Sequence, residues 1–351
     1  MPGTNIYDRR RFLETAAITI AAAQLPSFSF ANTKISKASL GDKKTVEHDS
    51  AGSFETIKQI HAGVLNIGYV DEGPADGPPV ILLHGWPYDI HSFAEVSPLL
   101  IAAGYRVIIP YLRGYGSTKF LSAETTRNGQ QSVFAVDTIA LMDALKIKKA
   151  IIGGFDWGAR TTGIIAALWP ERVKAIVSVS GYLIGNREAG KMPLPPGAEL
   201  QWWYQYYFAT PRGRAGYDKY RNDFAKLIWR IASPKWNFTD ATFNKTAASL
   251  QNEEHVDIVI HNYQWRLGLS EGESKYNDLE KRLAEGPLIT VPAITMEGDA
   301  NGAPHPDPAS YAEKFTGKYA HLLLKGIGHN IPQEDPRAFA EAIIKVDRHP
   351  G

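Results

Sequence analysis

Residues 150–160 read Ala-Ile-Ile-Gly-Gly-Phe-Asp-Trp-Gly-Ala-Arg, and this stretch indicates the fold more clearly than any other part of the chain. A short apolar run enters a Gly-x-Asp-x-Gly turn, after which the sequence takes on a helical pattern. The turn leaves no room for side chains at Gly154 and Gly158 and raises Asp156 above the end of the strand. A strand that turns tightly into a helix is the building unit of a parallel sheet. Taken alone, the turn also fits a helix with Asp156 as its N-cap.

Short apolar runs alternate with helical patterns from residue 54 onward, which indicates an α/β fold with a mostly parallel sheet. The run Val80–Leu83 is apolar throughout, as expected for a strand covered on both faces. We therefore expect an eight-stranded sheet with helices on both faces. The predicted strands are 55–60, 64–71, 80–84, 105–110, 150–155, 175–180, 293–297 and 321–324. The predicted helices are 92–103, 132–145, 159–168, 310–315 and 336–346.

The alternation stops at about residue 181 and resumes at about residue 287. The intervening segment is rich in Trp and Tyr, has helical patterning and contains no clear strand. An insertion of about one hundred residues is far longer than an ordinary loop. We therefore expect residues 182–286 to form a helical cap above the carboxyl ends of the strands, where open α/β sheets bind ligands. Residues 54–181 and 287–351 form the predicted core.

The N-terminal segment has the pattern of an export signal. Arg9, Arg10 and Arg11 precede an apolar run at 15–25, which resembles a twin-arginine signal. This run of 11 residues is too short to span a bilayer, for which roughly 20 are needed. We expect cleavage after Ala31, a polar lead-in at 32–53 and a periplasmic protein without a stable membrane anchor. The alternative is a cytoplasmic protein with an N-terminal helix.

The composition excludes several classes of function. Lys and Arg total 38 and Asp and Glu total 37, so the net charge of +1 provides no general field for binding nucleic acid. The absence of cysteine excludes disulfides, thiolate metal sites and a cysteine nucleophile. No pair of histidines has a convincing metal-site spacing. We expect a protein that acts on a small molecule without a metal or cofactor; the sequence does not indicate its oligomeric state.

Asp156 in the nucleophile position implies attack on an sp³ carbon. The product is an ester, which water and a base can hydrolyse, whereas a serine would leave a stable ether. The strings MEGD at 296–299 and GIGHN at 326–330 add an acid and a histidine in the order typical of α/β-hydrolases. We expect Asp299 to orient His329, with Glu297 as the rival acid.

The string HGWP at 84–87 follows a predicted strand and supplies a further part of the site. Its position suits a backbone N–H donor from Trp86 to a developing oxyanion. The N–H of Trp157, directly after the nucleophile, is the expected second donor.

Six strings together resemble the epoxide hydrolase branch of the α/β-hydrolase fold, which also includes haloalkane and fluoroacetate dehalogenases. The resemblance covers roughly residues 54–347. These strings are HGWP at 84–87, RGYGST at 113–118, FDWGAR at 155–160, LWPERV at 168–173, MEGD at 296–299 and GIGHN at 326–330. The chain departs from the family at Phe155, where histidine is usual, and at Tyr111, where an acidic residue is frequent.

The resemblance implies that epoxides are opened to diols through an Asp156 ester, with two cap tyrosines as proton donors. These roles fall on Tyr204 and Tyr263, with Tyr276 as the alternative to the second. The aromatic cap sequence suggests an apolar or aromatic substrate, although aromatic residues at helical spacing also serve as core. We expect the substrate to be contacted by His84, Trp157, Arg160, Trp203 and Phe208.

The sequence is also compatible with two other functions. A haloalkane or haloacid dehalogenase would use the same ester, with the Trp157 indole holding the halide. Arg160 resembles one of the two arginines that clamp the substrate carboxylate in fluoroacetate dehalogenases. The position of the second arginine is occupied here by Trp157. Arg160 could equally form an ion pair with a surface carboxylate. A binding protein that retains the fold without catalysis is the other alternative.

Overall fold

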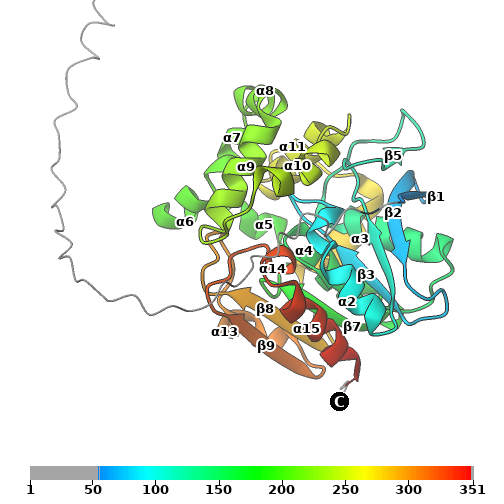
Figure 1. Cartoon of the computed structure of the whole chain (residues 1–351). Helices are drawn as coiled ribbons and strands as arrows, with labels where there is room; N and C mark the ends of the chain where they lie inside the picture. The colour runs from blue at the N-terminus through cyan, green and yellow to red at the C-terminus, as the bar shows by residue number, and fades with distance from the viewer. Residues whose placement is uncertain (1–53, 55, 349–351) are drawn as a thin grey trace, which may run out of the picture. The chain divides into compact units, whose positions relative to one another are not determined.

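In the computed structural model, residue 54 and residues 56–348 are described, and a nine-stranded sheet runs through them (Figure 1). The strand order is β1-β2-β4-β3-β6-β7-β8-β9, with β5 paired to β2. The strands are β1 (Lys58–Ala62), β2 (Leu65–Glu72), β3 (Pro79–Leu83), β4 (Arg106–Pro110), β5 (Lys119–Phe120), β6 (Ala150–Gly154), β7 (Val173–Val179), β8 (Ala293–Gly298) and β9 (Tyr319–Leu324).

The sheet is mostly parallel, as predicted, but it has one strand more than the eight expected. Strands β4, β3, β6, β7, β8 and β9 pair in parallel, whereas β2 is antiparallel to its partners β1, β4 and β5. The additional strand is β5, which places Phe120 opposite Leu65. Two residues are too few to produce a periodic pattern, and the sequence therefore did not reveal this strand.

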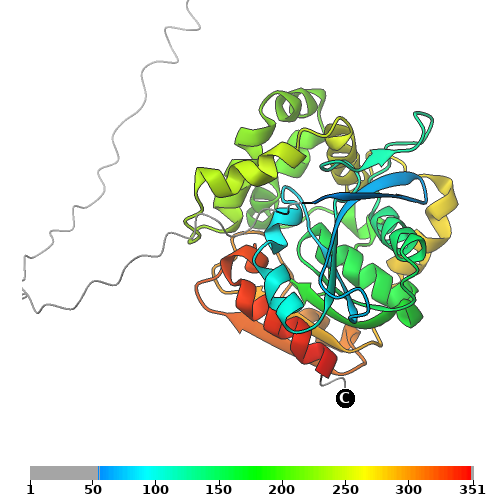
Figure 2. The ribbon, with the colours of Figure 1, turned by 45° about the vertical axis from the view of Figure 1, so that its right-hand side comes forward.

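Two pairs of helices cover the sheet. In Figure 1, α2 (Val96–Ala102) and α15 (Pro336–Arg348) lie in front of the sheet, whereas α3 (Gln131–Ala144) and α4 (Trp157–Leu168) lie behind it; in the turned view of Figure 2 the two pairs stand on opposite sides of the sheet. The predicted helix at 92–103 is divided into η1 (Ile90–Phe93) and α2. Pro98 lies in the first turn of α2, where proline is tolerated, so the helix begins anew at this point. The short elements of the core are η2 (Pro170–Arg172), α13 (Pro308–Tyr311), η4 (Ala312–Lys314) and α14 (Ile331–Glu334).

The segment predicted as a cap contains only helices between β7 and β8 in the part of the chain that is described. In Figure 1, the helices from α6 to α11 gather on one side of the sheet. The helices are α5 (Arg187–Gly190), α6 (Pro196–Gln201), α7 (Trp203–Phe208), α8 (Pro211–Lys219), α9 (Arg221–Ala232), α10 (Asp240–Ser249), α11 (His255–Arg266), η3 (Ser274–Tyr276) and α12 (Asn277–Ala284).

The predicted export signal at 1–31 and the lead-in at 32–53 lie outside the described residues. Among the described helices, none has the length and apolar character needed to cross a membrane.

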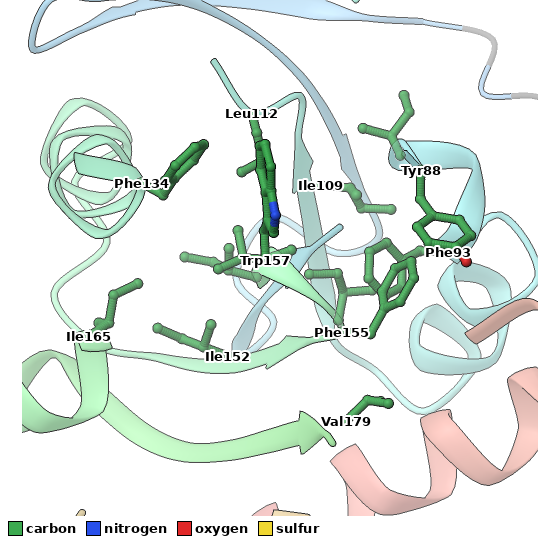
Figure 3. Close-up of a cluster of buried hydrophobic side chains, with 14 of the residues drawn as sticks. Tyr88, Phe93, Ile109, Leu112, Phe134, Ile152, Phe155, Trp157, Ile165 and Val179 are labelled. Carbon is green, nitrogen blue, oxygen red and sulfur yellow. The ribbon is translucent and has the colours of Figure 1, made fainter. Parts of the chain in front are cut away.

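A cluster of buried side chains anchors the end of β6 (Figure 3). Phe155 and Trp157, the neighbours of Asp156 in the chain, extend to opposite sides of the strand. Phe155 packs against Tyr88, with ring centroids 4.9 Å apart, while Trp157 packs against Phe134 at 5.3 Å. Because both neighbours are fixed in apolar surroundings, the position of Asp156 between them is tightly constrained.

Candidate active site

The backbone at Asp156 has the strained geometry that the turn predicted. Its φ is 56° and its ψ is −123°, a region that residues other than glycine rarely adopt. A Cβ placed on Gly158 would lie 1.8 Å from the backbone oxygen of Leu83. One placed on Gly85 would lie 2.3 Å from the Cβ of Asp156. The segments around Asp156 approach so closely that only glycine fits at position 158, in the same turn, and at position 85, in the neighbouring loop.

Three predicted groups contact the carboxylate of Asp156. Its Oδ1 accepts hydrogen bonds from the backbone N–H groups of Trp86, at 2.8 Å, and Trp157, at 2.7 Å. Its Oδ2 lies 3.3 Å from Nε2 of His329. Burial opposes ionisation, but the His329 ring and the two N–H donors outweigh it and lower the pKa of Asp156 below its usual value. Asp156 is thus an ionised carboxylate whose Oδ2 remains available for attack.

His329 lies in the loop between β9 and α14, and packing holds its ring. The ring centroid is 6.0 Å from that of Tyr88 and 6.2 Å from that of Phe155. Its backbone N–H donates to Oγ of Ser233 at 3.0 Å, and this hydroxyl donates to Glu334 at 2.6 Å. Nδ1 of the ring is buried and has no hydrogen-bond partner among the described residues.

The predicted bond between Asp299 and His329 is not formed. Asp299 is exposed, and its Oδ1 accepts a 2.6 Å hydrogen bond from the N–H of Gly326. The rival acid, Glu297, is buried but accepts from the side chain of Asn301, at 2.8 Å, and from the N–H of Gly298. The spacing of the MEGD string could not predict this outcome, because β8 ends at Gly298 and the chain direction beyond a strand end depends on the next loop.

A cavity of about 510 Å³ opens beside Asp156, within the range typical of small-molecule sites. The two predicted tyrosines, Tyr204 and Tyr263, line it together with Asp156 and His329. The tyrosine rings meet edge to face with centroids 5.4 Å apart. Burial raises the pKa of both hydroxyls, so both remain protonated donors. The full lining is Asp156, Trp157, Arg160, Ser180, Leu183, Leu194, Ala198, Gln201, Trp202, Tyr204, Tyr263, Arg266, Ala303, Pro304, His305, Pro306 and His329.

His84 was predicted to contact the substrate, but it does not line this cavity. It is fully buried, with Nδ1 3.1 Å from the oxygen of Gly85, and Nε2 accepts from the N–H of Leu112 at 3.2 Å. Burial lowers its pKa to about 4, so the ring is neutral at physiological pH. Its contacts join the oxyanion loop to the segment after β4, a structural role.

Trp203 and Phe208 were also predicted to contact the substrate, and neither lines the cavity. Trp203 packs on Phe224 with ring centroids 5.4 Å apart, and Phe208 is fully buried against Trp86 at 5.7 Å. Tyr276, the alternative second tyrosine, is not among the lining residues either. In this aromatic-rich segment, spacing alone could not separate core side chains from cavity side chains.

Arg266 and Trp202 line the cavity although the sequence interpretation did not select them. Arg266 follows Tyr263 by three residues in α11, which places both on one face of the helix. This three-residue spacing from a predicted cavity tyrosine is the sequence feature that could have indicated Arg266. Trp202 lies at the junction of α6 and α7, and the guanidinium carbon of Arg266 lies 5.0 Å from the centre of the Trp202 ring. Arg160 donates from Nε to the backbone oxygen of Leu183 at 3.2 Å.

A metal site is not evident in the described part of the chain. Within residue 54 and residues 56–348, no group of three or more His, Asp or Glu side chains is arranged to hold a metal ion.

Comparisons with known proteins agree with this architecture. Residues 78–225 match the family model of the alpha/beta hydrolase fold. The chain is 64% identical to a protein of Klebsiella pneumoniae subsp. pneumoniae provisionally described as an epoxide hydrolase; its crystal structure aligns with a TM-score of 0.84 over 86% of this chain and 100% of that one.

Two curated relatives are more distant. An epoxide hydrolase from Caballeronia sordidicola is 25% identical over 295 residues, which cover 78% of this chain and 88% of the relative. A haloalkane dehalogenase from Mycobacterium marinum is 31% identical over 187 residues, which cover 49% of this chain and 62% of the relative.

Proposed function

The chain belongs to the α/β-hydrolase family and is an epoxide-hydrolase-like hydrolase, and on this premise we propose that it opens epoxides to diols through an ester on Asp156. One observation carries the choice of substrate class. Two protonated cap tyrosines, Tyr204 and Tyr263, share a cavity with the carboxylate and with His329. Epoxide opening needs a proton donor at the oxygen that leaves the carbon, and these hydroxyls supply it.

In the first step, Oδ2 of Asp156 attacks an epoxide carbon. A bond forms between Oδ2 and that carbon while the carbon–oxygen bond of the ring breaks. The oxygen that is released takes a proton from Tyr204 or Tyr263, since an alkoxide is far more basic than a phenolate. The enzyme is left with a hydroxyalkyl ester and a tyrosinate.

In the second step, His329 removes a proton from water, which attacks the ester carbonyl carbon. The developing oxyanion is Oδ1, and the N–H groups of Trp86 and Trp157 already donate to it. The bond from the carbonyl carbon to Oδ2 breaks, and the protonated histidine supplies the proton that completes the diol. The carboxyl proton that remains on Asp156 returns to the tyrosinate, which restores the enzyme.

A panel of aryl and alkyl epoxides and haloalkanes, assayed for diol and halide together, tests this function. We expect diol without halide, and no diol from Asp156→Ala. A single turnover in H₂¹⁸O with enzyme in excess should place ¹⁸O in the Asp156 peptide. An unlabelled peptide after diol formation would refute the ester route. Ligand binding without either product would instead favour a non-catalytic binding protein.

A dehalogenase is the second candidate, and one observation favours it. The indole N–H of Trp157 is buried and has no acceptor among the described residues, and Trp157 is one of the residues that line the cavity. Such a donor suits a departing halide ion. Halide release without diol in the same panel would establish this alternative.

We also propose that residues 1–31 direct export through a twin-arginine pathway. The support is the arginine cluster before a short apolar run. Replacing Arg9 and Arg10 together with Lys should leave the full-length protein in the cytoplasmic fraction, whereas the unchanged chain should appear in the periplasm with the segment removed. Equal periplasmic recovery of both would contradict the proposal.

A further inference from the structure

Two guanidinium groups reach the active-site cavity from different elements. Arg160 lies in the first turn of α4, four residues after Asp156, and Arg266 is the last residue of α11 in the cap. Both line the cavity. Neither forms an ion pair with a carboxylate in the described part of the chain. Arg113, by contrast, is buried and binds Asp137 through two 2.7 Å hydrogen bonds.

The protein contacts of the two side chains leave most of their donors free. Arg160 uses only Nε, toward Leu183, and no described residue accepts from its two terminal nitrogens. Arg266 places its guanidinium over the rings of Trp202, at 5.0 Å, and Tyr263, at 5.7 Å. A cation–π contact does not use the N–H donors as hydrogen bonds to an acceptor atom, so these donors can still bind a ligand.

The electrostatics of the cavity favour an anion. Burial, followed by the neighbouring charge of Arg266, lowers the pKa of Arg160 to about 10, so Arg160 still carries its charge at neutral pH. Asp156 is the single carboxylate among the described lining residues, and it is already engaged by Trp86, Trp157 and His329. Apart from its two histidines, the lining therefore holds two cations and one anion, which leaves one positive charge in excess. A partly buried charge without a partner is costly, and a bound monoanion would relieve that cost.

We propose that the natural substrate is an epoxide that carries a carboxylate, with the carboxylate bound between Arg160 and Arg266 and the oxirane held at Asp156 beneath the two tyrosines. The proposal rests on the proposed function and specifies its substrate class. A carboxylate matches the planar fork of a guanidinium and, as a monoanion, balances the excess charge. The hydrocarbon body of the substrate fits the remaining lining, which includes Leu183, Leu194 and Trp202.

A helix-stabilising role explains Arg266 only in part. A cation in the last turn of α11 interacts favourably with the helix dipole, and stacking on Trp202 adds to that. Neither effect explains why Arg160, in the first turn of a helix where a cation is unfavourable, is brought into the same cavity without a carboxylate partner.

The first test compares 3-phenyloxirane-2-carboxylate with its neutral carboxamide, which has nearly the same shape. We expect kcat/KM for the acid to exceed that for the amide by about tenfold or more, the effect of charge-assisted hydrogen bonds. Arg160→Gln and Arg266→Gln should each reduce the acid-to-amide ratio toward unity, and Arg160→Lys should retain part of it. The matched control is Arg214→Gln, which removes an exposed arginine paired with Asp257 elsewhere on the cap and should leave the ratio unchanged.

The second test is independent of catalysis. Binding of trans-cinnamate and cinnamamide, followed by calorimetry, compares the same charge difference without a reactive ring. Tighter binding of cinnamate that is lost in both Gln variants supports the anion site, even if no epoxide is hydrolysed, in which case only the proposed function fails. Equal affinities for the two ligands, or an acid-to-amide ratio unaffected by either Gln variant, would overturn the carboxylate proposal while leaving epoxide hydrolysis intact.

Discussion

Removing the hydroxyl of Tyr217 should destabilise the protein strongly, because this group joins two buried side chains. Nδ1 of His255 lies 2.9 Å from the oxygen of Gly114, which requires a proton on Nδ1 and leaves Nε2 as an acceptor. The Tyr217 hydroxyl therefore donates to Nε2 at 2.8 Å and accepts from the indole of Trp86 at 2.7 Å. Tyr217→Phe leaves both partners buried and unpaired. At about 1–3 kcal/mol for each of the two unpaired groups, we expect a loss of about 2–6 kcal/mol in the free energy of unfolding.

Urea denaturation followed by circular dichroism measures this loss. Tyr115→Phe is the matched control, since Tyr115 is equally buried and packs against His255 at a ring distance of 4.7 Å, but its hydroxyl has no hydrogen-bond partner among the described residues. The control should change stability by no more than about 0.5 kcal/mol or raise it slightly. A loss in Tyr217→Phe no larger than that in the control would refute the argument that the hydroxyl bridges the two side chains.

Three other perturbations test separate parts of the structure. Asp299→Asn should keep kcat within about threefold of the wild type, because Asp299 is exposed and does not contact His329. A loss of kcat near 10⁴-fold, typical of an essential orienting acid, would contradict the conclusion that Asp299 does not orient His329. Burial lowers the pKa of His255 to about 3, whereas the unfolded chain protonates near 6.5, so stability should fall by about 1.4 kcal/mol per pH unit as pH decreases between these values. Denaturation of His255→Asn at several pH values should show a free energy of unfolding that depends less steeply on pH than that of the wild type. Equal slopes for the two proteins would refute this expectation. Gly158→Ala should lower the free energy of unfolding by more than about 3 kcal/mol, because the added Cβ would meet a backbone oxygen. Gly197→Ala, in open space within α6, should instead raise it by up to about 1 kcal/mol. Similar melting temperatures for the two variants would contradict both expectations.

Local chemistry made the nucleophile turn predictable. The glycines around Asp156 are required by contacts within a few residues and with one neighbouring strand, so the Gly-x-Asp-x-Gly string alone indicates the geometry. The order of Asp156 and His329 along the chain was similarly informative, because parallel strands bring their carboxyl ends to one edge. The backbone donors Trp86 and Trp157 followed from the same reasoning.

Contacts between distant segments decided what the sequence could not predict. Arg266 lies in the cavity because Tyr263, on the same face of α11, packs against Trp157 of α4 with ring centroids 5.9 Å apart, and nothing within α11 itself predicts that contact. Trp202 and Phe208 are both large aromatic residues and lie only six positions apart in the cap, yet Phe208 belongs to the core and Trp202 lines the cavity. Asp299 turns toward Gly326 because the loop after β9 offers a free N–H there. Each outcome depends on the tertiary arrangement rather than on local pattern.

The unequal environments of the two Asp156 oxygens give them different fates in the proposed reaction. Oδ1 stays on the protein, because two backbone donors hold it throughout, whereas Oδ2 departs inside the diol and is replaced by oxygen from solvent. Every product molecule therefore contains an oxygen atom that entered the protein during the preceding cycle. The enzyme thus keeps an isotopic record of its solvent for one cycle. After an abrupt change to heavy-oxygen water, the first diol released by each molecule is light, and every later one is heavy.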